Sequence, residues 1–163
     1  MKAFYIIFCA FLFSSCKSSD DKFSELLIKD SKGEVCISIF ENFTMRENET
    51  YFHPTEKEIQ LAESLLKIEL RKTNSQLVQD YHFFSETETP LSLSEYKRQY
   101  YPIVSKNKQK TIYFLGVCRE LLYLYPKWTE KQIHTAGGGN CFFRGEINLS
   151  LKKVTSLSVN API

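Results

Sequence analysis

The feature that most constrains the fold is a run of apolar residues at helical spacing that begins just after Pro54. Thr55 and Glu58 have the spacing of a capping box, in which two side chains satisfy the first backbone N–H groups of a helix. Polar and charged residues occupy the opposite side, and a stripe this wide is typical of a helix that covers a sheet. The apolar positions are Ile59, Ala62, Leu66 and Leu70, flanked by Leu61, Leu65 and Ile68.

Strand patterns precede this helix, and a second helical pattern follows it. Residues 26–28 and 35–40 flank the turn-forming stretch Asp30-Ser31-Lys32-Gly33, so we predict a β-hairpin. Residues 76–84 have no clear period and fit either a strand or a packed loop. A second capping box, Ser92-Leu93-Ser94-Glu95, predicts a short helix that runs to Tyr101 and is ended by Pro102.

The C-terminal part of the chain predicts a meander of strands. Residues 112–118, 141–149 and 154–160 have strand patterns, and residues 128–136 form a further extended segment. Gly137-Gly138-Gly139-Asn140 turns the chain, because glycine adopts positive φ without strain. Within the second of these strands, side chains alternate between two faces. One face carries Cys141, Phe143, Ile147 and Leu149, and the other carries Phe142, Arg144, Glu146 and Asn148.

Together these elements predict the α+β class, with one antiparallel sheet packed on one long amphipathic helix. The sheet would combine the N-terminal hairpin with the C-terminal meander. This arrangement resembles the cystatin-like and nuclear-transport-factor-2-like folds. The resemblance concerns fold alone and implies no function.

The first residues have the pattern of a secretory signal: one basic residue, an apolar run and a cysteine after two small residues. Leu12-Phe13-Ser14-Ser15-Cys16 resembles the lipobox of bacterial lipoproteins, with Phe13 where leucine is commonest. The resemblance implies that the Cys16 thiol takes a diacylglycerol and becomes the mature N-terminus. A membrane span would need about 20 apolar residues, more than this run contains. A secreted protein with a chance cysteine is the alternative.

We therefore expect three segments: a signal peptide over residues 1–15, a lipidated tether over 16–23, and a single α+β domain over 24–163. The resemblance also implies which membrane the lipoprotein is sorted to. Lys17 is not the aspartate that holds many such lipoproteins at the inner membrane, so we expect the outer membrane. Lys17-Ser18-Ser19-Asp20-Asp21 resembles the export signal of surface lipoproteins in Bacteroidota, and a solvated tether explains the same residues. The sequence leaves surface and periplasmic exposure open.

The second half resembles a family of small, uncharacterised Bacteroidota lipoproteins over roughly residues 93–163. This resemblance supports the predicted fold and the predicted membrane location, and it implies no active-site residues. The resemblance is carried by Tyr96-Lys97-Arg98-Gln99-Tyr100, residues 112–117, Trp128, the glycine turn with Phe142-Phe143, and residues 147–161.

Charge excludes one class of partner. The chain carries a net charge of +2, and the basic residues do not cluster into the face that nucleic acid requires. Five of them, Lys97, Arg98, Lys106, Lys108 and Lys110, are interpreted as a solvated basic turn. We expect no nucleic-acid partner.

Three cysteines follow the lipobox: Cys36, Cys118 and Cys141. An oxidising envelope permits disulfides, and Cys118–Cys141 is the favoured pair because both lie in predicted strands of the same half. The third cysteine is then a small buried hydrophobe. No pair has the C-x-x-C spacing of a metal or redox site.

No catalytic motif is evident, and we expect no cofactor and no metal. The glycine turn lacks the Gly-Lys-Ser/Thr ending of a phosphate loop. His53, His82 and His134 are scattered, so a hydrolase would need His82 or His134 to meet a carboxylate or Cys141 in a pocket between sheet and helix. A cystatin-like inhibitor is disfavoured, because residues 76–80 lack the final glycine of the inhibitory hairpin and residues 126–128 carry an extra residue.

Aromatic residues crowd the middle of the chain, and exposed together they would make a binding face. The candidates are Tyr96, Tyr100, Tyr101, Tyr113 and Trp128, near Tyr123 and Tyr125. The alternative is that most lie half-buried on the sheet. We also expect that Tyr100 and Tyr101 cannot both point inward if their segment is helical or extended. The leading hypothesis is an outer-membrane lipoprotein that binds a protein partner without catalysis, such as an envelope immunity protein or a subunit of a surface complex.

The lipobox interpretation predicts that Cys16→Ala releases the domain from the membrane, because the variant cannot take the lipid. Protease treatment of intact cells measures exposure of the wild type. Shaving from outside indicates the cell surface, and protection until the envelope is opened indicates the periplasm. A variant that stays bound to the membrane would contradict the interpretation.

Overall fold

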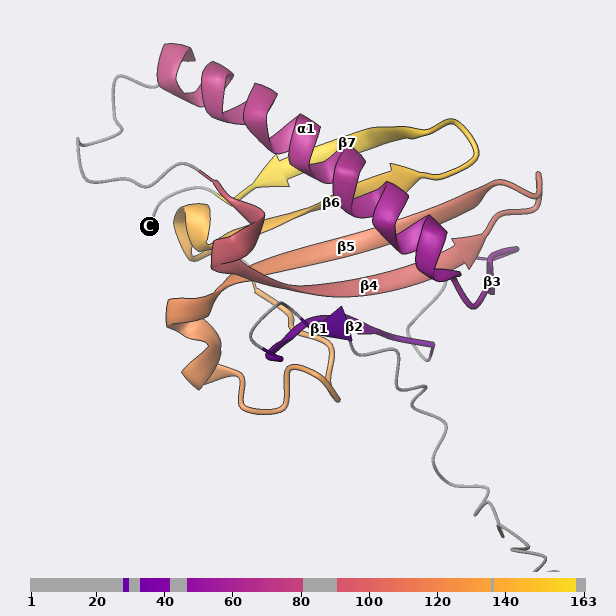
Figure 1. Cartoon of the computed structure of the whole chain (residues 1–163), viewed down its shortest axis with the longest axis horizontal. Helices are drawn as coiled ribbons and strands as arrows, with labels where there is room; N and C mark the ends of the chain where they lie inside the picture. The colour runs from indigo at the N-terminus through magenta and orange to yellow at the C-terminus, as the bar shows by residue number, and fades with distance from the viewer. Residues whose placement is uncertain (1–27, 30–32, 42–46, 81–90, 136, 161–163) are drawn as a thin grey trace, which may run out of the picture.

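The structure is a computed structural model that describes residues 28–29, 33–41, 47–80, 91–135 and 137–160, without the side chains of residues 75–80. The predicted signal peptide, Cys16 and the tether lie outside the described residues. The described part is a mixed α+β arrangement, as predicted, with one long helix lying across a seven-stranded sheet (Figure 1).

The sheet has the strand order β1-β2-β4-β5-β6-β7, and the short β3 also pairs with β4. The helix is α1 (Glu56–Asp80), and three 3-10 turns, η1 (Leu93–Glu95), η2 (Arg119–Leu124) and η3 (Gly139–Cys141), connect strands. The strands are β1 (Ile28–Lys29), β2 (Val35–Ile39), β3 (Thr50–Tyr51), β4 (Tyr96–Val104), β5 (Lys110–Cys118), β6 (Phe142–Asn148) and β7 (Lys153–Val159).

The predicted N-terminal hairpin is present, since β1 and β2 pair antiparallel. The prediction of a purely antiparallel sheet is wrong at one junction, because β2 pairs with β4 in parallel. Parallel neighbours need a long crossover, and α1 supplies it. The segment β2–α1–β4 is therefore one crossover unit, followed by the antiparallel meander β4–β5–β6–β7.

The predicted capping box begins α1. Glu58 accepts hydrogen bonds from the Thr55 backbone N–H (2.8 Å) and hydroxyl (2.9 Å), and the Glu58 N–H donates to Thr55 Oγ1 (3.3 Å). The helix continues to Asp80, so residues 76–80 are helical and not a strand or loop. Residues 81–84 lie outside the described residues. Because residues 76–80 are helical, they do not form the inhibitory hairpin of a cystatin.

The predicted short helix from Ser92 to Tyr101 is wrong. Only η1 is helical, the Ser92 side chain caps nothing, and a strand begins at Tyr96. Pairing with β2 and β5 on both sides outweighs the local capping pattern. Pro102 is tolerated inside this strand, because the contact with β2 ends at Tyr100 and that with β3 begins at Ile103. The missing N–H faces that gap.

Both faces of the sheet carry apolar residues. The α1 face contains the larger core, in which Leu66, Tyr100 and Phe143 are fully buried. The opposite face has a second cluster, Leu115, Val117, Ile133 and Phe142. The chain between β5 and β6 covers this second cluster. Residues 128–136 are predicted as an extended segment, and those of them that the structure describes, 128–135, form no strand in this covering loop.

Gly145 marks a close approach inside the sheet. A Cβ atom there would lie 2.0 Å from the Ser156 carbonyl oxygen of β7 and 2.8 Å from the Phe114 ring. The backbone oxygen cannot rotate away, so neighbouring strands can approach this closely only at a glycine.

We therefore expect Gly145→Ala to lower the free energy of unfolding by about 1–3 kcal/mol. Urea unfolding, with the slope held against the wild type, measures the change. Ser156→Ala is the matched control, because that side chain is exposed. Equal midpoints for wild type and Gly145→Ala would contradict the close approach.

Candidate functional site

A disulfide closes the segment that leaves the sheet after β5 and returns at β6. Cys118, the last residue of β5, is bonded to Cys141, which directly precedes β6. This is the pair that the sequence favoured, and residues 119–140 are called the disulfide loop below. The sequence separation of 23 corresponds to about 3 kcal/mol of lost unfolded-state entropy in the loop-closure model.

The disulfide loop is held on the sheet by one buried amide. Gln99 of β4 is 1% exposed. Its Nε2 donates to the carbonyl oxygens of Trp128 (2.5 Å) and Lys131 (2.7 Å). Its Oε1 accepts from the Ile133 N–H (3.0 Å) and from the Tyr101 hydroxyl (2.7 Å). All hydrogen-bonding positions of this amide are thus used, three of them on the loop backbone.

Further contacts fix the same loop. The Ser38 hydroxyl of β2 donates to the Thr129 carbonyl oxygen at 2.9 Å. Ile133 is buried in the second cluster, and the Tyr125 ring meets Phe142 edge-on with centroids 6.1 Å apart. Trp128 packs against this cluster and is half-buried. The loop backbone is therefore anchored by side chains from β2, β4 and β6.

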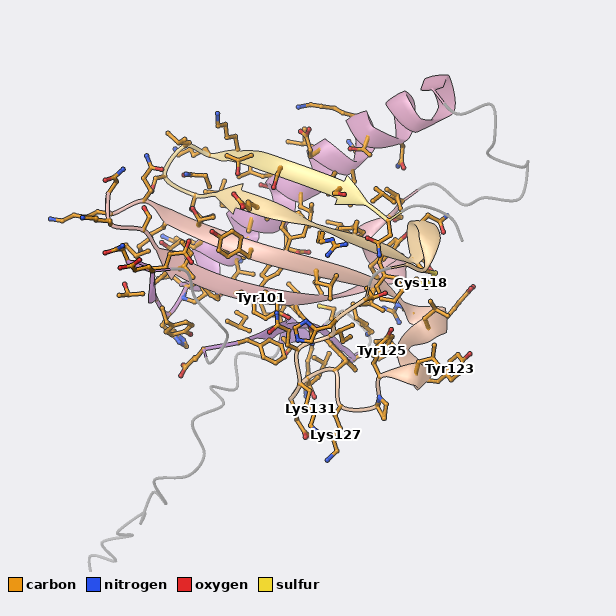
Figure 2. All side chains as sticks on the ribbon, turned by 180° about the vertical axis from the view of Figure 1, so that it is seen from behind. Tyr101, Cys118, Tyr123, Tyr125, Lys127 and Lys131 are labelled. Carbon is orange, nitrogen blue, oxygen red and sulfur yellow. A yellow bond between two sulfur atoms is a disulfide. The ribbon has the colours of Figure 1, made fainter. Side chains whose placement is uncertain are left out.

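The outer side of this loop exposes large apolar side chains. Tyr123 is 75% exposed and Leu124 is 54% exposed, and both lie on η2. Figure 2 shows Tyr123 on the outside of η2, with Lys127 and Lys131 at the end of the loop farthest from the sheet. A shallow pocket of about 330 Å³ lies beside them, lined by Leu124, Tyr125, Lys127, Trp128, Lys131 and Ile133, among others.

The structure does not bring the five predicted aromatic residues to one exposed surface. Tyr96, Tyr100 and Tyr101 are buried, with exposures of 5%, 0% and 5%. Tyr113 is half-buried and its hydroxyl donates to Glu49 at 2.8 Å. Of the five, Trp128 alone lies in the disulfide loop. The exposed aromatic surface is instead centred on Tyr123.

Tyr100 and Tyr101 are both buried because each face of β4 is covered. Tyr100 lies under α1, where its hydroxyl donates to Glu63. Tyr101 points to the other face, where it contacts Phe40 and Gln99. Burial, together with the Glu63 charge, raises the pKa of Tyr100 well above its ordinary value. Burial also raises the pKa of Tyr96 to about 12.

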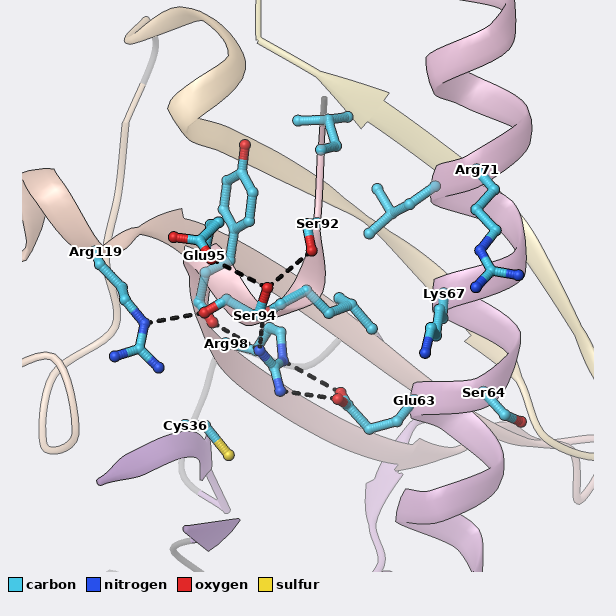
Figure 3. A pocket seen from close by; sticks show the side chains of 14 residues that line it. Cys36, Glu63, Ser64, Lys67, Arg71, Ser92, Ser94, Glu95, Arg98 and Arg119 are labelled. Carbon is cyan, nitrogen blue, oxygen red and sulfur yellow. Dashed lines mark hydrogen bonds and ion pairs between the residues drawn. The ribbon is translucent and has the colours of Figure 1, made fainter. Parts of the chain in front are cut away.

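A second candidate site lies on the opposite face, between α1 and the start of β4. Figure 3 shows its floor, where Arg98 and Glu63 meet. The Arg98 Nη2 to Glu63 Oε2 distance is 2.8 Å, and Arg98 Nη1 donates to the Leu93 and Tyr96 carbonyl oxygens. The pocket has a volume of about 770 Å³, and Lys67, Arg71 and Arg119 also line it.

Two of the basic residues expected in a solvated turn are buried instead. Lys97 is 6% exposed and pairs with Glu34 at 3.3 Å, and Arg98 is 5% exposed and pairs with Glu63. A buried charge is tolerated only with a partner, and both residues have one. Arg119 also binds Glu34, and the two cations lower the pKa of that carboxyl. Of these pairs, Arg98 with Glu63 forms the floor of the pocket, whereas neither Lys97 nor Glu34 lines it.

The described residues assemble no catalytic pair in that pocket. No histidine lines it. Cys141 is in the disulfide, so it has no thiol to act as a nucleophile. His134 is exposed on the other face, where it shares a pocket of about 430 Å³ with Glu146, yet no hydrogen bond or ion pair joins the two. His82 lies outside the described residues.

Among residues 28–29, 33–41, 47–80, 91–135 and 137–160, no group of three or more metal-ligating side chains comes together. No helix in this part of the chain has the length and hydropathy of a membrane span. No protein-family model, curated protein or solved structure matches the chain.

The residues that matter most to the disulfide loop were missed by sequence reasoning. Ser38 lies in a predicted strand and Gln99 lies in the wrongly predicted short helix, and neither pattern indicates a contact with residues 128–133. Tyr123 was noted only as a neighbour of the aromatic candidates, and Leu124 was not singled out. The one usable indication was the polar and aromatic stretch enclosed by Cys118 and Cys141, which a disulfide turns into a closed loop.

We expect Gln99→Ala to loosen the disulfide loop, because it leaves two carbonyl oxygens and one N–H buried without partners. The expected loss in the free energy of unfolding is about 2–4 kcal/mol. Trypsin should also cleave the variant after Lys127 or Lys131 faster than the wild type. Tyr101→Phe, which removes one of the four hydrogen bonds, should cost about 1 kcal/mol. Equal proteolysis of Gln99→Ala and wild type would contradict the role given to this amide.

Proposed function

We propose that this protein is an outer-membrane lipoprotein, anchored through Cys16, whose α+β domain binds a protein partner without catalysis. The observation that carries the proposal is the pair Tyr123 and Leu124. Two adjacent large apolar side chains are exposed on a loop that a disulfide and a buried amide hold in place. The lipobox pattern at Leu12–Cys16 supports the anchor.

Exposure of Tyr123 and Leu124 has a physical cost that binding would offset. Removing an apolar side chain from water gains roughly 25 cal/mol per Å², and tyrosine is enriched among residues that dominate binding energy. The loop backbone is already ordered by Gln99 and Ser38, so association would lose little conformational entropy. A preorganised loop with an apolar tip suits a partner that has a complementary pocket.

The charged residues near Tyr123 and Leu124 indicate the kind of protein surface that would bind there. Lys127 and Lys131 are exposed, and neither has an ion pair within the described residues. Both line the same shallow pocket as Leu124. Complementarity therefore favours a protein surface with an apolar pocket rimmed by carboxylates. A toxin domain neutralised by an immunity protein, or a neighbouring subunit of a surface complex, would fit this description.

The finer fold that we propose is cystatin-like or nuclear-transport-factor-2-like, supported by the single helix across an antiparallel-rich sheet. The parallel β2–β4 pair departs from the simplest version of that arrangement. A hydrolase has no supporting observation among the described residues of the pocket beside α1, where no histidine lines the wall and Arg98 pairs with Glu63.

A photo-crosslinking amino acid in place of Tyr123 should form a protein adduct in intact cells. The same amino acid at Ile68, an exposed apolar residue of α1, should form none. Charge reversal by Lys127→Glu with Lys131→Glu should abolish the Tyr123 adduct, because it repels an acidic rim.

Lys106→Glu with Lys108→Glu is the matched control for that charge reversal, since both lysines are exposed in the β4–β5 turn. The control should leave the adduct in place. The proposal fails if the Tyr123 probe captures nothing, if the Ile68 probe captures the same protein, or if both charge reversals act alike.

A further inference from the structure

The last strand of the sheet has an open edge. β7 pairs with β6 on one side, and no described strand pairs with its other side. Figure 1 shows this strand at the border of the sheet, with the C-terminal half of α1 projecting past it. The opposite border ends in the two-residue β1, so β7 is the longer of the two edge strands.

The backbone groups that face outward can be assigned from one hydrogen bond. The Asn160 N–H donates to the Phe142 carbonyl oxygen at 3.0 Å, so the backbone polar groups of Asn160 face β6. Alternate residues of a strand direct these groups to opposite sides. Those of Ser158 therefore also face β6, and those of Leu157 and Val159 face away from it. Within the described residues, these two N–H and two C=O groups have no partner.

Within the part of the chain that the structure describes, this edge lacks the usual protection against strand addition. Natural edges are blocked by charges, proline or a covering segment. β7 has the sequence Lys-Val-Thr-Ser-Leu-Ser-Val, with no proline and with its single charge at the first residue, Lys153. The one irregularity in this strand is a register shift at Thr155, opposite Glu146 and Ile147, and the pairing is regular from Ser156 to Val159.

The side chains beside the edge define what could pair with it. Leu157 and Val159 are half-buried and pack against the core on the α1 face, whereas Ser156 and Ser158 are exposed on the other face. Lys152 and Lys153 are exposed at the start of the strand without an ion pair in the described part of the chain. A strand antiparallel to β7 would bring its C-terminal end to these two lysines.

A single extended segment fits this edge better than a second copy does. Two copies joined edge to edge as one continuous sheet would have their α1 helices on the same face. Each helix projects past the β7 edge, so the two helices would converge over the junction (Figure 1). One added strand meets no such obstacle and lies beneath the projecting helix.

We propose that β7 binds an extended segment of another protein as an added antiparallel strand. The segment carries apolar side chains at alternate positions, toward α1, and acidic residues at its C-terminal end, beside Lys152 and Lys153. Its backbone pairs with the outward groups of Leu157 and Val159. Main-chain pairing supplies affinity in such complexes, and the alternate side chains supply specificity.

The probe is the acetylated peptide Thr-Val-Thr-Val-Thr-Glu-Glu, with its binding to the full chain in detergent micelles measured by fluorescence anisotropy. Two N-methylated versions are compared, each methylated at one of the two sets of alternate amides. Only one set can face β7, so one version should lose binding and the other should retain it. Lys152→Glu with Lys153→Glu should weaken binding roughly fivefold.

Val159→Pro removes an outward N–H without breaking the pairing to β6, so it should abolish binding. Ser158→Ala, at an exposed side chain of the opposite face, should leave binding unchanged. The N-methylated peptides keep the test decisive where Val159→Pro fails to fold by circular dichroism.

Equal affinity of both N-methylated peptides, or no binding of the unmodified peptide, would overturn the proposal. So would sedimentation as a dimer that Val159→Pro dissociates, because the edge would then belong to a second copy. The crosslinking experiment at Tyr123 uses a different surface, so either result stands without the other.

Discussion

The side-chain amide of Gln99 is the constraint on which the second layer of this protein depends. The first layer, α1 on the sheet, is held by a broad apolar face and would form for many sequences of the same pattern. The disulfide loop covers its face of the sheet with a largely irregular backbone as well as with apolar side chains such as Tyr125 and Ile133. Its backbone polar groups must therefore find partners at the sheet surface, and Gln99 supplies three of them. The Tyr101 hydroxyl donates the fourth hydrogen bond to this amide and holds its orientation.

The two layers meet in β4, which is buried along almost its whole length. Gln99 and Tyr101 face the disulfide loop, whereas Arg98 and Tyr100 face α1 and share Glu63. A strand covered on both faces can carry polar residues only where each finds a partner. The unusual polarity of this central strand is thus a consequence of having a helix on one side and an irregular loop on the other.

Much of the α1 layer could be predicted from sequence, and much of the loop layer could not. Thr55, Glu58 and the apolar stripe follow local rules that depend on residues three or four positions apart, and the start of α1 agrees with them. The same kind of reasoning failed for β4, because the capping-box pattern at Ser92–Glu95 competes with pairing to strands far away in sequence. Tyr96 to Val104 are strand because β2 and β5 bind them, which no local pattern shows.

The candidate site shows the same limit. The pairing of Cys118 with Cys141 was accessible to sequence reasoning, because both cysteines fall at ends of neighbouring strands. The position of Tyr123 on the outside, and of Tyr100 and Tyr101 on the inside, depends on which faces are covered. The number of aromatic residues in a sequence does not show whether they form an exposed binding face or a buried core.

The parallel pairing of β2 with β4 has a consequence for how the chain folds. The meander β4–β7 needs only neighbouring hairpins, and such local contacts form quickly. β2 can find β4 only after α1 has been placed, since the helix lies between them in sequence and closure of that long connection costs entropy. The meander and its disulfide would therefore form a nucleus on which the N-terminal strands dock last. A chain emerging from its N-terminus must then carry the β1–β2 hairpin without its partner strand β4 until its C-terminal half has been made.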